Sequence, residues 1–304
     1  MKNVKIYNNK LIKMVKIKLI CNHNTSNIRS KEIEQFKLDK HKHIEFVYND
    51  DKPDYYVIEN HPFFEKKKQY YDPTKTIYVH CEPKTSRDLW NKWKETETFL
   101  YDHKRNWNIP HVINQTRNIN QTINNIITKD KKNKRKISYV TSDLDMLPGH
   151  KLRVNIMPHI DTLNKYNIKP DIYGREKVGY FTKFKLKNYL GEIDNREDSL
   201  LNYYYNMMAE NCQEVDYFTE KILDPILCET LCFYWGCPNV KSYLHPKSYI
   251  NLDFTRPKLA IQTIVNSINN DEYTKRYKYI KESKRKIIYE LNPIDILDKV
   301  INKI

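Results

Sequence analysis

An acid and a base stand side by side in the stretch DYFTEKILDPILCETLCFYWGCP, which runs from Asp216 to Pro238. Thr219 is a good helix N-cap residue and Glu220 suits a first helical turn, so the capping of a surface helix accounts for both. A helix N-terminus after a buried strand is also an anion-binding site, where Lys221 would supply a full positive charge. The two interpretations are compatible, and the second predicts a bound anion such as a phosphate.

Asp143 and Asp145 form a second candidate site in the segment SDLD, directly after the strand-like KISYVT. An Asp-x-Asp pair in this position resembles the metal-binding pair of one large glycosyltransferase fold, whose carboxylates hold a divalent ion against a nucleotide-sugar diphosphate. A pattern of three residues also arises often by chance in a chain with 38 acidic residues. A metal-dependent glycosyltransferase is therefore kept as an alternative.

Glu82 is a third candidate, because it ends the strand-like segment TIYVHCEP and could face a cleft. The competing interpretation is an ordinary loop acid. Glycine motifs give no help with phosphate binding: glycine occurs only at positions 149, 174, 179, 191 and 236, so neither G-x-G-x-x-G nor a P-loop can be drawn. Any phosphate must be held by side chains and helix ends.

The elements that would position these residues recur as strands alternating with helical or irregular segments. Strand-like segments in the first half are VKIKLIC, HIEFVYN, DYYVIEN, TIYVHCEP and TFLYDH, and INQTRNINQTINNIITK is helical. In the second half KISYVT, DIYG, NYYYNMMAEN, the end of ILDPILCETLCFYWGCP and KSYINLDF are strand-like, with helical segments between them and from Pro257 onward. This order predicts an α/β protein with two Rossmann-like units and a cleft between them.

The basic run KDKKNKRK, from Lys129 to Lys136, indicates a boundary between the two units. We therefore expect an N-terminal domain over residues 1–130, a second domain over 131–270, and C-terminal helices over 271–304. Such a division agrees with a length of 304 residues, which exceeds the usual size of one domain.

The net charge of +15, from 53 Lys+Arg against 38 Asp+Glu, favours a polyanionic or phosphorylated partner. A nucleic-acid-binding protein is thus a competing hypothesis. However, lysines are spread through nearly every segment together with many Asn, Ile and Tyr residues, a pattern typical of an AT-rich genome. No zinc-finger spacing, arginine-rich helix or aromatic RNA-binding motif is present, so we expect no nucleic-acid partner.

The six cysteines are too few and too apolar in context for a disulfide framework in a chain of this length, so we expect them to be reduced. Cys228, Cys232 and Cys237 lack the paired spacing of a zinc site. The N-terminus contains neither a signal-peptide-like stretch nor a membrane span. A cytoplasmic protein is expected, in the cytoplasm of a host cell if the AT-rich genome is viral.

The block from Asn202 to Phe254 resembles the C-terminal block of the family 10 glycosyltransferases, the α-1,3/4-fucosyltransferases. That family has a tyrosine-rich strand ending in Glu-Asn, then Tyr-Ile/Val-Thr-Glu-Lys, a helix, an apolar strand closing on Gly, Pro-x-Ser-Phe/Tyr-Ile and Asp-Phe. The matching residues here are Glu210-Asn211, Tyr217 to Lys221, Phe233 to Gly236, Pro246 to Ile250 and Asp253-Phe254. Order and spacing match almost without gaps over some fifty residues.

The resemblance implies a GT-B type fold, in which two Rossmann-like domains face each other across a cleft. It also implies an inverting transfer of fucose from GDP-fucose to a sugar hydroxyl, most simply as an α-1,3-fucosyltransferase. The partners would be a nucleotide sugar, bound by the 131–270 domain, and a glycan acceptor, bound by the 1–130 domain. No cofactor would be required, and Asp143 and Asp145 would then be loop residues near the donor.

Residue by residue, the resemblance implies that Lys221 pairs with the donor diphosphate and that Arg153 takes the place of a family arginine that binds the phosphates. Glu220 would lie against the ribose or fucose and is assigned a catalytic role with Glu82, which matches the position of the family's general base. The other donor-binding residues would be Glu210, Asn211, Tyr217 and Thr219.

Three departures from the family pattern carry structural expectations. Pro225 falls inside the helix after Thr219, so that helix either starts later or bends. Cys232 replaces a proline that is common before the closing strand. Ala209 stands where a bulky aromatic is usual, which would widen the pocket. The first domain hardly matches the family beyond the strand before Glu82, so neither the acceptor nor the oligomeric state is predicted.

Overall fold

The computed structural model describes residues 4–7, 10–21, 30–31, 33–34, 37–48, 52–64, 67–79, 82–86, 99–103, 135–194 and 197–302. The chain divides into two compact units. Unit 1 comprises Met1–Ile109 and Glu290–Ile304, and unit 2 comprises Pro110–Tyr289. The helical segment expected at 113–129, most of the basic run that follows it and the expected boundary at residue 130 lie outside the described residues.

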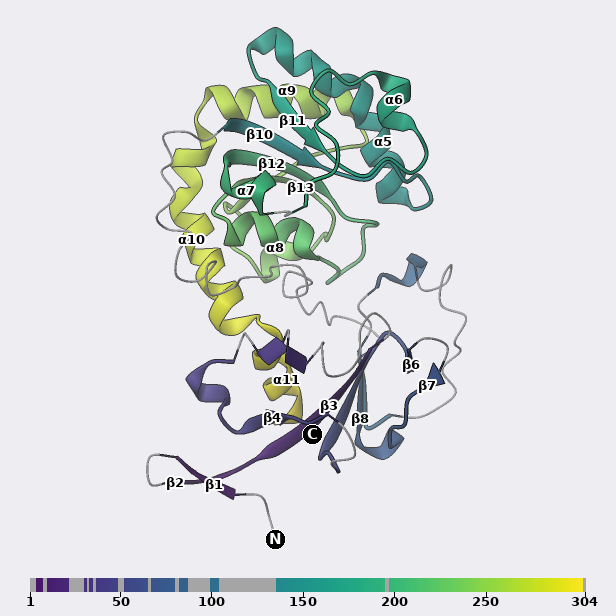
Figure 1. The fold of residues 1–304 in the computed structure, drawn as a ribbon. Coiled ribbons are helices and arrows are strands. Elements are labelled where there is room, and N and C mark those ends of the chain that lie inside the picture. The colour runs from purple at the N-terminus through teal and green to yellow at the C-terminus, as the bar shows by residue number, and fades with distance from the viewer. Residues whose placement is uncertain are drawn as a thin grey trace. The chain divides into compact units, whose positions relative to one another are not determined.

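Unit 1 is built on a five-stranded parallel sheet in the order β4-β3-β5-β8-β9. Its strands are β3 (Val15–Cys21), β4 (Ile44–Phe46), β5 (Tyr55–Glu59), β8 (Thr76–Val79) and β9 (Tyr101–His103). The unit also contains two small antiparallel hairpins, β1 (Val4–Tyr7) with β2 (Lys10–Lys13) and β6 (Phe63–Phe64) with β7 (Lys67–Lys68) (Figure 1). All five expected strands of the first half are confirmed. Strand β8 is buried along its whole length, as a parallel strand covered on both faces is, whereas β3 keeps partly exposed lysines at positions 16 and 18.

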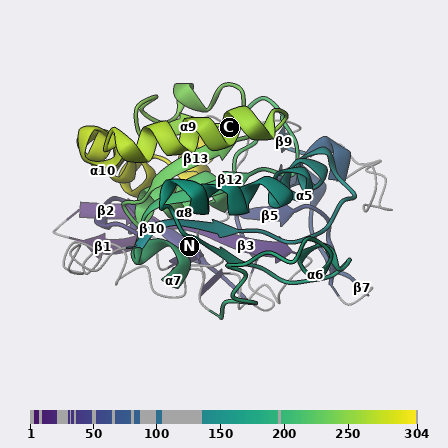
Figure 2. The same ribbon diagram turned by 90° about the horizontal axis from the view of Figure 1, so that it is seen from above.

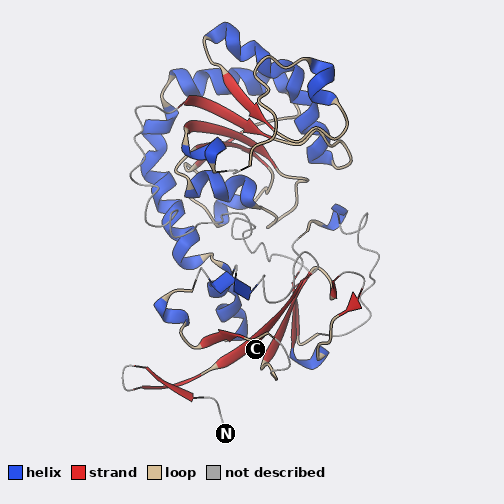
Figure 3. Ribbon diagram, in the orientation of Figure 1, coloured by secondary structure: helices blue, strands red, loops and turns tan. Residues whose placement is uncertain are grey.

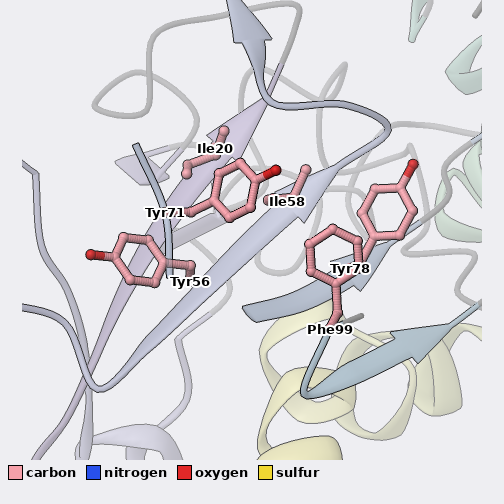
Figure 4. Close-up of a cluster of buried hydrophobic side chains, with 6 residues drawn as sticks. All are labelled: Ile20, Tyr56, Ile58, Tyr71, Tyr78 and Phe99. Carbon is pink, nitrogen blue, oxygen red and sulfur yellow. The ribbon is translucent and has the colours of Figure 1, made fainter. Parts of the chain in front are cut away.

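An aromatic cluster closes one part of the unit 1 core. It consists of Ile20, Tyr56, Ile58, Tyr71, Tyr78 and Phe99, which come from the strands β3, β5 and β8 and from the segments beside them (Figure 4). The rings of Tyr78 and Phe99 lie 5.0 Å apart, and the Tyr78 hydroxyl donates a hydrogen bond to the carbonyl of Asn60 at 2.6 Å. The buried phenol is thereby satisfied, as a buried hydroxyl requires.

The last helix, α11 (Pro293–Ile301), belongs to unit 1. Its N-terminus is capped by Asn292, whose side chain accepts from the backbone N–H groups of Ile294 and Asp295. Asp295 bonds to His41 at 2.9 Å, and burial lowers the pKa of His41 although Asp295 opposes the shift. These side-chain contacts attach the end of the chain to the first unit, whereas the sequence set 271–304 apart as C-terminal helices.

Unit 2 contains a second five-stranded parallel sheet, in the order β11-β10-β12-β13-β14. Its strands are β10 (Arg135–Val140), β11 (Pro170–Tyr173), β12 (Tyr203–Ala209), β13 (Leu231–Trp235) and β14 (Tyr249–Asn251), shown in red in Figure 3. Pro170 begins the edge strand β11, a position at which its missing N–H is tolerated. The expected α/β class, with two Rossmann-like units, is confirmed by these two parallel sheets.

Helices connect and cover the strands of unit 2 (Figures 1 and 2). They are α5 (Pro148–Ile160), α6 (Tyr180–Phe184), α7 (Asp198–Leu201), α8 (Glu220–Leu227), α9 (Pro257–Asn269) and α10 (Glu272–Glu290). Helix α8 packs on β12 and β13, and α5 packs on α9 and β12. Among the described residues no helix combines the length and apolar character needed to cross a bilayer.

The proline inside α8 does not displace the helix start. The helix begins at Glu220 with Thr219 as N-cap, as the capping pattern predicts, and Pro225 lies within it. A proline cannot donate to the carbonyl four residues earlier, which here belongs to Lys221. The Cys232 thiol donates to that carbonyl instead, at 3.7 Å. One departure from the family pattern, Cys232, therefore supplies the donor that another departure, Pro225, lacks.

Helix α10 is attached to the rest of unit 2 by a buried ion pair. The Lys284 ammonium lies 2.9 Å from the Glu229 carboxylate, and both side chains are buried. Tyr277 donates a short hydrogen bond to the same carboxylate, and the Tyr273 hydroxyl donates to the Glu229 carbonyl at 3.1 Å. The Tyr277 hydroxyl gives the carboxylate a second donor, which a buried pair needs in order to offset its desolvation.

Candidate active site

A cavity of about 610 Å³ opens at the carboxyl ends of β10, β11 and β12. Ligands of open α/β sheets bind at this edge. The strand ends contribute Val140, Thr141, Gly174, Met208 and Ala209 to the lining, and the charged or polar lining groups include His150, Arg153, Asn211, Glu220 and Lys221. His150 and Arg153 belong to the first two turns of α5, and Glu220 and Lys221 belong to the first turn of α8. The partial positive charges of two helix N-termini therefore act on the cavity.

Gly149 allows the first turn of α5 to lie directly on the end of β12. Its N–H donates to the carbonyl of Asn211 at 2.8 Å. A Cβ at this position would lie 1.8 Å from the carbonyl oxygen of Glu210, a separation that no heavier residue can accept. The Pro-Gly pair at 148–149 thus serves two local needs, because proline suits the first helical position and glycine permits the close approach.

Arg153 is a buried cation that forms no ion pair with any carboxylate in the described part of the chain. It is 5% exposed and lines the cavity. Its Nε donates to the Gly149 carbonyl at 3.3 Å and its Nη2 donates to the Asn211 side-chain oxygen at 2.8 Å. Burial lowers the pKa of the guanidinium, although Tyr139 and Glu210 oppose the shift. An arginine nevertheless stays protonated in proteins, so this arrangement favours an anion in the cavity.

Glu210 anchors the start of α8 from below the cavity. Its carboxylate is fully buried and accepts hydrogen bonds from the Thr219 N–H and the Thr219 hydroxyl, both at 2.7 Å, and from the Tyr234 hydroxyl at 3.3 Å. Burial raises the pKa of this carboxyl, although Lys221 and the Thr219 donors oppose the shift. Glu210 and Thr219, both expected to bind the donor, do not line the cavity but hold the helix end that does.

Lys221 lies at the cavity wall between two carboxylates. Its ammonium is 2.8 Å from Glu220 and 3.7 Å from Glu210, and it also donates to the Thr219 hydroxyl at 3.2 Å. Lys221 is thus in contact with two carboxylates, whereas Glu210 and Glu220 act on Arg153 only from beyond ion-pair distance. An anion in the cavity would find a guanidinium without an ion-pair partner among the described residues and an ammonium that must exchange partners.

The remaining candidates from the sequence lie in different places. Asn211 lines the cavity and holds Arg153, whereas Tyr217 is 5% exposed and is not part of the lining. Glu82 belongs to unit 1, where it is half-buried in the loop after β8. Ala209 lines the cavity, and the wider pocket expected from its small side chain stays a prediction.

Sequence reasoning missed His150. This side chain is 4% exposed and lines the cavity, and its Nδ1 accepts from the N–H of Leu147 at 3.4 Å. Burial and the charge of Arg153 lower the pKa of His150 to about 4, although a hydrogen bond with Asn211 opposes the shift. The imidazole is therefore neutral at pH 7 and, with Nδ1 accepting, carries its hydrogen on Nε2. The only sequence signal for this site residue was the position of a histidine two residues after Pro148.

The Asp143 carboxylate has a structural task. Its two oxygens accept four backbone N–H groups, those of residues 177, 178, 179 and 180, at 2.5 to 3.0 Å. Burial raises its pKa, but these four donors outweigh that effect and hold the pKa below its ordinary value. Asp145 accepts from the Tyr180 hydroxyl at 2.8 Å. In the described part of the chain no three His, Cys, Asp or Glu residues come together as a metal site.

Comparison with known proteins adds the following. Residues 130–294 match the family model described as glycosyltransferase family 10 (fucosyltransferase), C-terminal. The chain is 34% identical over 115 residues to the alpha-(1,3)-fucosyltransferase FucT of Helicobacter pylori, a match that spans 37% of this chain and only 22% of that relative.

Among solved structures, an α1,3-fucosyltransferase with GDP-fucose is 19% identical, with a TM-score of 0.48 over 95% of this chain and 94% of that one. WaaG, a glycosyltransferase involved in lipopolysaccharide biosynthesis, is 10% identical, with a TM-score of 0.47 over 95% and 99%.

Proposed function

Since the chain belongs to glycosyltransferase family 10, whose family model covers residues 130–294, we propose that it transfers fucose from GDP-fucose to a hydroxyl of a glycan, as an inverting α-1,3-fucosyltransferase. The observation that carries the proposal is Arg153, a buried guanidinium that lines the cavity and forms no ion pair with any described carboxylate. A diphosphate would supply the missing negative charge.

The donor would bind with its diphosphate between Arg153 and the start of α8. The hydrogen bond that Arg153 Nη2 donates to the Asn211 side-chain oxygen fixes the plane of the guanidinium, so the phosphate oxygens would meet donors that are already oriented. Lys221 would exchange its contact with Glu220 for the diphosphate. Glu220, released from that pair, would then be available to the ribose or the fucose.

Transfer with inversion requires a base that takes the proton from the acceptor hydroxyl. The oxygen attacks the anomeric carbon of fucose, and the bond to the β-phosphate oxygen breaks on the opposite face, with its electron pair leaving on GDP. We assign the base to Glu82, on the resemblance of its place after β8. The negative charge that develops on the diphosphate would be stabilised by Arg153, Lys221 and the helix N-termini.

We propose that no metal ion takes part. The hydrogen bonds of Asp143 support this, because a metal ion bound there would have to displace four backbone donors. Full activity in EDTA is the expected result. Activity that is lost in EDTA and restored by a divalent ion would instead favour a metal-dependent transferase using Asp143 and Asp145.

The first experiment compares GDP, UDP and CDP in a thermal-shift assay of the full chain. GDP is expected to raise the Tm of the protein. A rise with UDP alone, or no rise with any of the three nucleotides, would refute the proposed donor.

Release of GDP from GDP-fucose is then measured with a panel of glycan acceptors. Glu82→Gln should lower kcat with donor affinity unchanged, and unchanged turnover would place the base elsewhere. The cytoplasmic location stays a prediction.

A further inference from the structure

A second cavity, of about 490 Å³, lies at the carboxyl ends of β13 and β14. Its volume falls within the range of about 300–1,000 Å³ typical of small-molecule sites. The ends of β13 and β14 contribute Trp235 and Asn251, a short 3-10 helix (Val240–Ser242) contributes Lys241, and the segment after β12 contributes Gln213. None of these four residues belongs to the lining of the first cavity.

Trp235 is the central feature of the second cavity. It is half-buried, and within the described part of the chain its indole nitrogen donates no hydrogen bond and its ring contacts no other ring or cation. A buried tryptophan N–H usually finds a partner. The neighbouring aromatic Tyr234 is in contrast fully engaged, since its hydroxyl donates to Glu210 and accepts from the N–H of Cys237. The Trp235 ring is therefore available to a ligand.

The polar side chains around Trp235 define the class of that ligand. The amides of Gln213 and Asn251 form no hydrogen bond with described residues, and each can donate and accept. Lys241 is exposed and is the single cation of the lining. Asp253, the single carboxylate, is occupied by Thr255 and Arg256. One aromatic face with uncharged donors and acceptors suits a neutral sugar ring better than a phosphate.

The second cavity adjoins the first along one loop. Asn211 lines the first cavity and Gln213 lines the second, so two residues of the segment after β12 connect them. Two residues span at most about 7 Å. Tyr234, which lines the second cavity, also donates a hydrogen bond to Glu210, the residue before Asn211, at 3.3 Å. A ligand in the second cavity would thus lie beside a donor bound in the first.

We propose that the cavity at Trp235 binds a pyranose ring of the acceptor glycan, with the ring face on the indole and the hydroxyls on Gln213 and Asn251. This inference rests on the proposed fucosyl transfer. It gives unit 2 a share in acceptor selection, which the sequence assigned to the first domain.

The test uses the full chain, labelled and applied to a glycan array at saturating GDP, in four forms: wild type, Trp235→Ala, Trp235→Phe and Gln213→Ala. Loss of a tryptophan anchor should weaken binding to the glycans that the wild type selects by about 30-fold. Phe should restore part of it, and loss of the Gln213 hydrogen bond should cost about 2- to 10-fold. The matched control is Tyr166→Ala, an aromatic that is 48% exposed and lines neither cavity.

GDP affinity, measured by calorimetry on the same variants, separates the two levels of the proposal. Reduced glycan binding with GDP affinity within about 2-fold of wild type supports the inference. Retained glycan binding in Trp235→Ala and Gln213→Ala overturns it, as does a wild type that binds GDP but no glycan. A wild type that does not bind GDP refutes the proposed function itself. Gln213 is exposed, so its variant keeps the test valid if Trp235→Ala fails to fold.

Discussion

Replacing Arg153 with methionine should strongly weaken donor binding while leaving the stability of the empty protein nearly unchanged. The guanidinium is 5% exposed and, among the described residues, donates hydrogen bonds to Gly149 and Asn211 and forms no ion pair with a carboxylate. A buried cation costs several kcal/mol of desolvation free energy, and hydrogen bonds to a charged group return about 1.5 to 3 kcal/mol each. These contributions nearly cancel, so we expect the free energy of unfolding to change by less than about 1 kcal/mol.

The effect on binding should be much larger. Truncating a buried charge that bonds a ligand costs about 2 to 5 kcal/mol, which corresponds to a 30- to 4,000-fold rise in Kd. At a GDP concentration of about 100 times the wild-type Kd, GDP stabilises the wild type by about 2.7 kcal/mol, whereas a variant with a 100-fold higher Kd gains only about 0.4 kcal/mol. With about 2–4 °C per kcal/mol for a unit of this size, the GDP-induced rise in Tm falls from about 5–10 °C to about 1 °C.

Differential scanning calorimetry with and without GDP measures both quantities on one sample. The matched control is Arg276→Met, which removes an arginine of α10 that is paired with Glu272 at 2.7 Å and is absent from the lining of the cavity that holds Arg153. The control should keep the full GDP-induced shift. The reasoning about Arg153 is refuted if Arg153→Met keeps that shift, or if the empty variant loses more than about 3 kcal/mol of stability, since the guanidinium would then be a structural group.

Three further predictions concern the frame of the site. Gly149→Ala should cost more than about 3 kcal/mol in urea unfolding because its Cβ would meet the Glu210 carbonyl at 1.8 Å, whereas Gly179→Ala, at φ 100° in open space, should cost only about 1 kcal/mol. Because its pKa is lowered to about 4, His150 binds fewer protons in the folded than in the unfolded protein, so the unfolding free energy should fall by up to about 3 kcal/mol as the pH drops from about 6.5 to 4. Urea unfolding measured against pH should show that this decrease is absent in His150→Gln and remains in the control His159→Gln. Asp143→Asn should lower the unfolding free energy by about 2 to 4 kcal/mol, because four N–H groups lose a charged acceptor, and should leave the response of activity to EDTA unchanged; a loss of activity without a loss of stability would contradict its structural role.

Several elements could be predicted because their signals are local. Alternation of apolar residues placed the strands of both sheets, and the Thr219 cap placed the beginning of α8 at the residue where it occurs. The family block identified Asn211, Glu220 and Lys221, and the resemblance outside the block identified Arg153; all four line one cavity. Pro225 left the helix start open in the sequence, since the partner that replaces its missing N–H, Cys232, comes from the next strand.

Capping, strand alternation and the spacing of the fucosyltransferase block are carried by residues within a few positions of one another, so the sequence by itself determined the elements and the family. The tertiary structure decided the roles within the site. Arg153 and Asn211 are 58 positions apart, and His41 and Asp295 are 254 positions apart. The partner of a buried charge and the neutrality of His150 depend on such distant contacts, because desolvation and hydrogen bonding act through space and not along the chain.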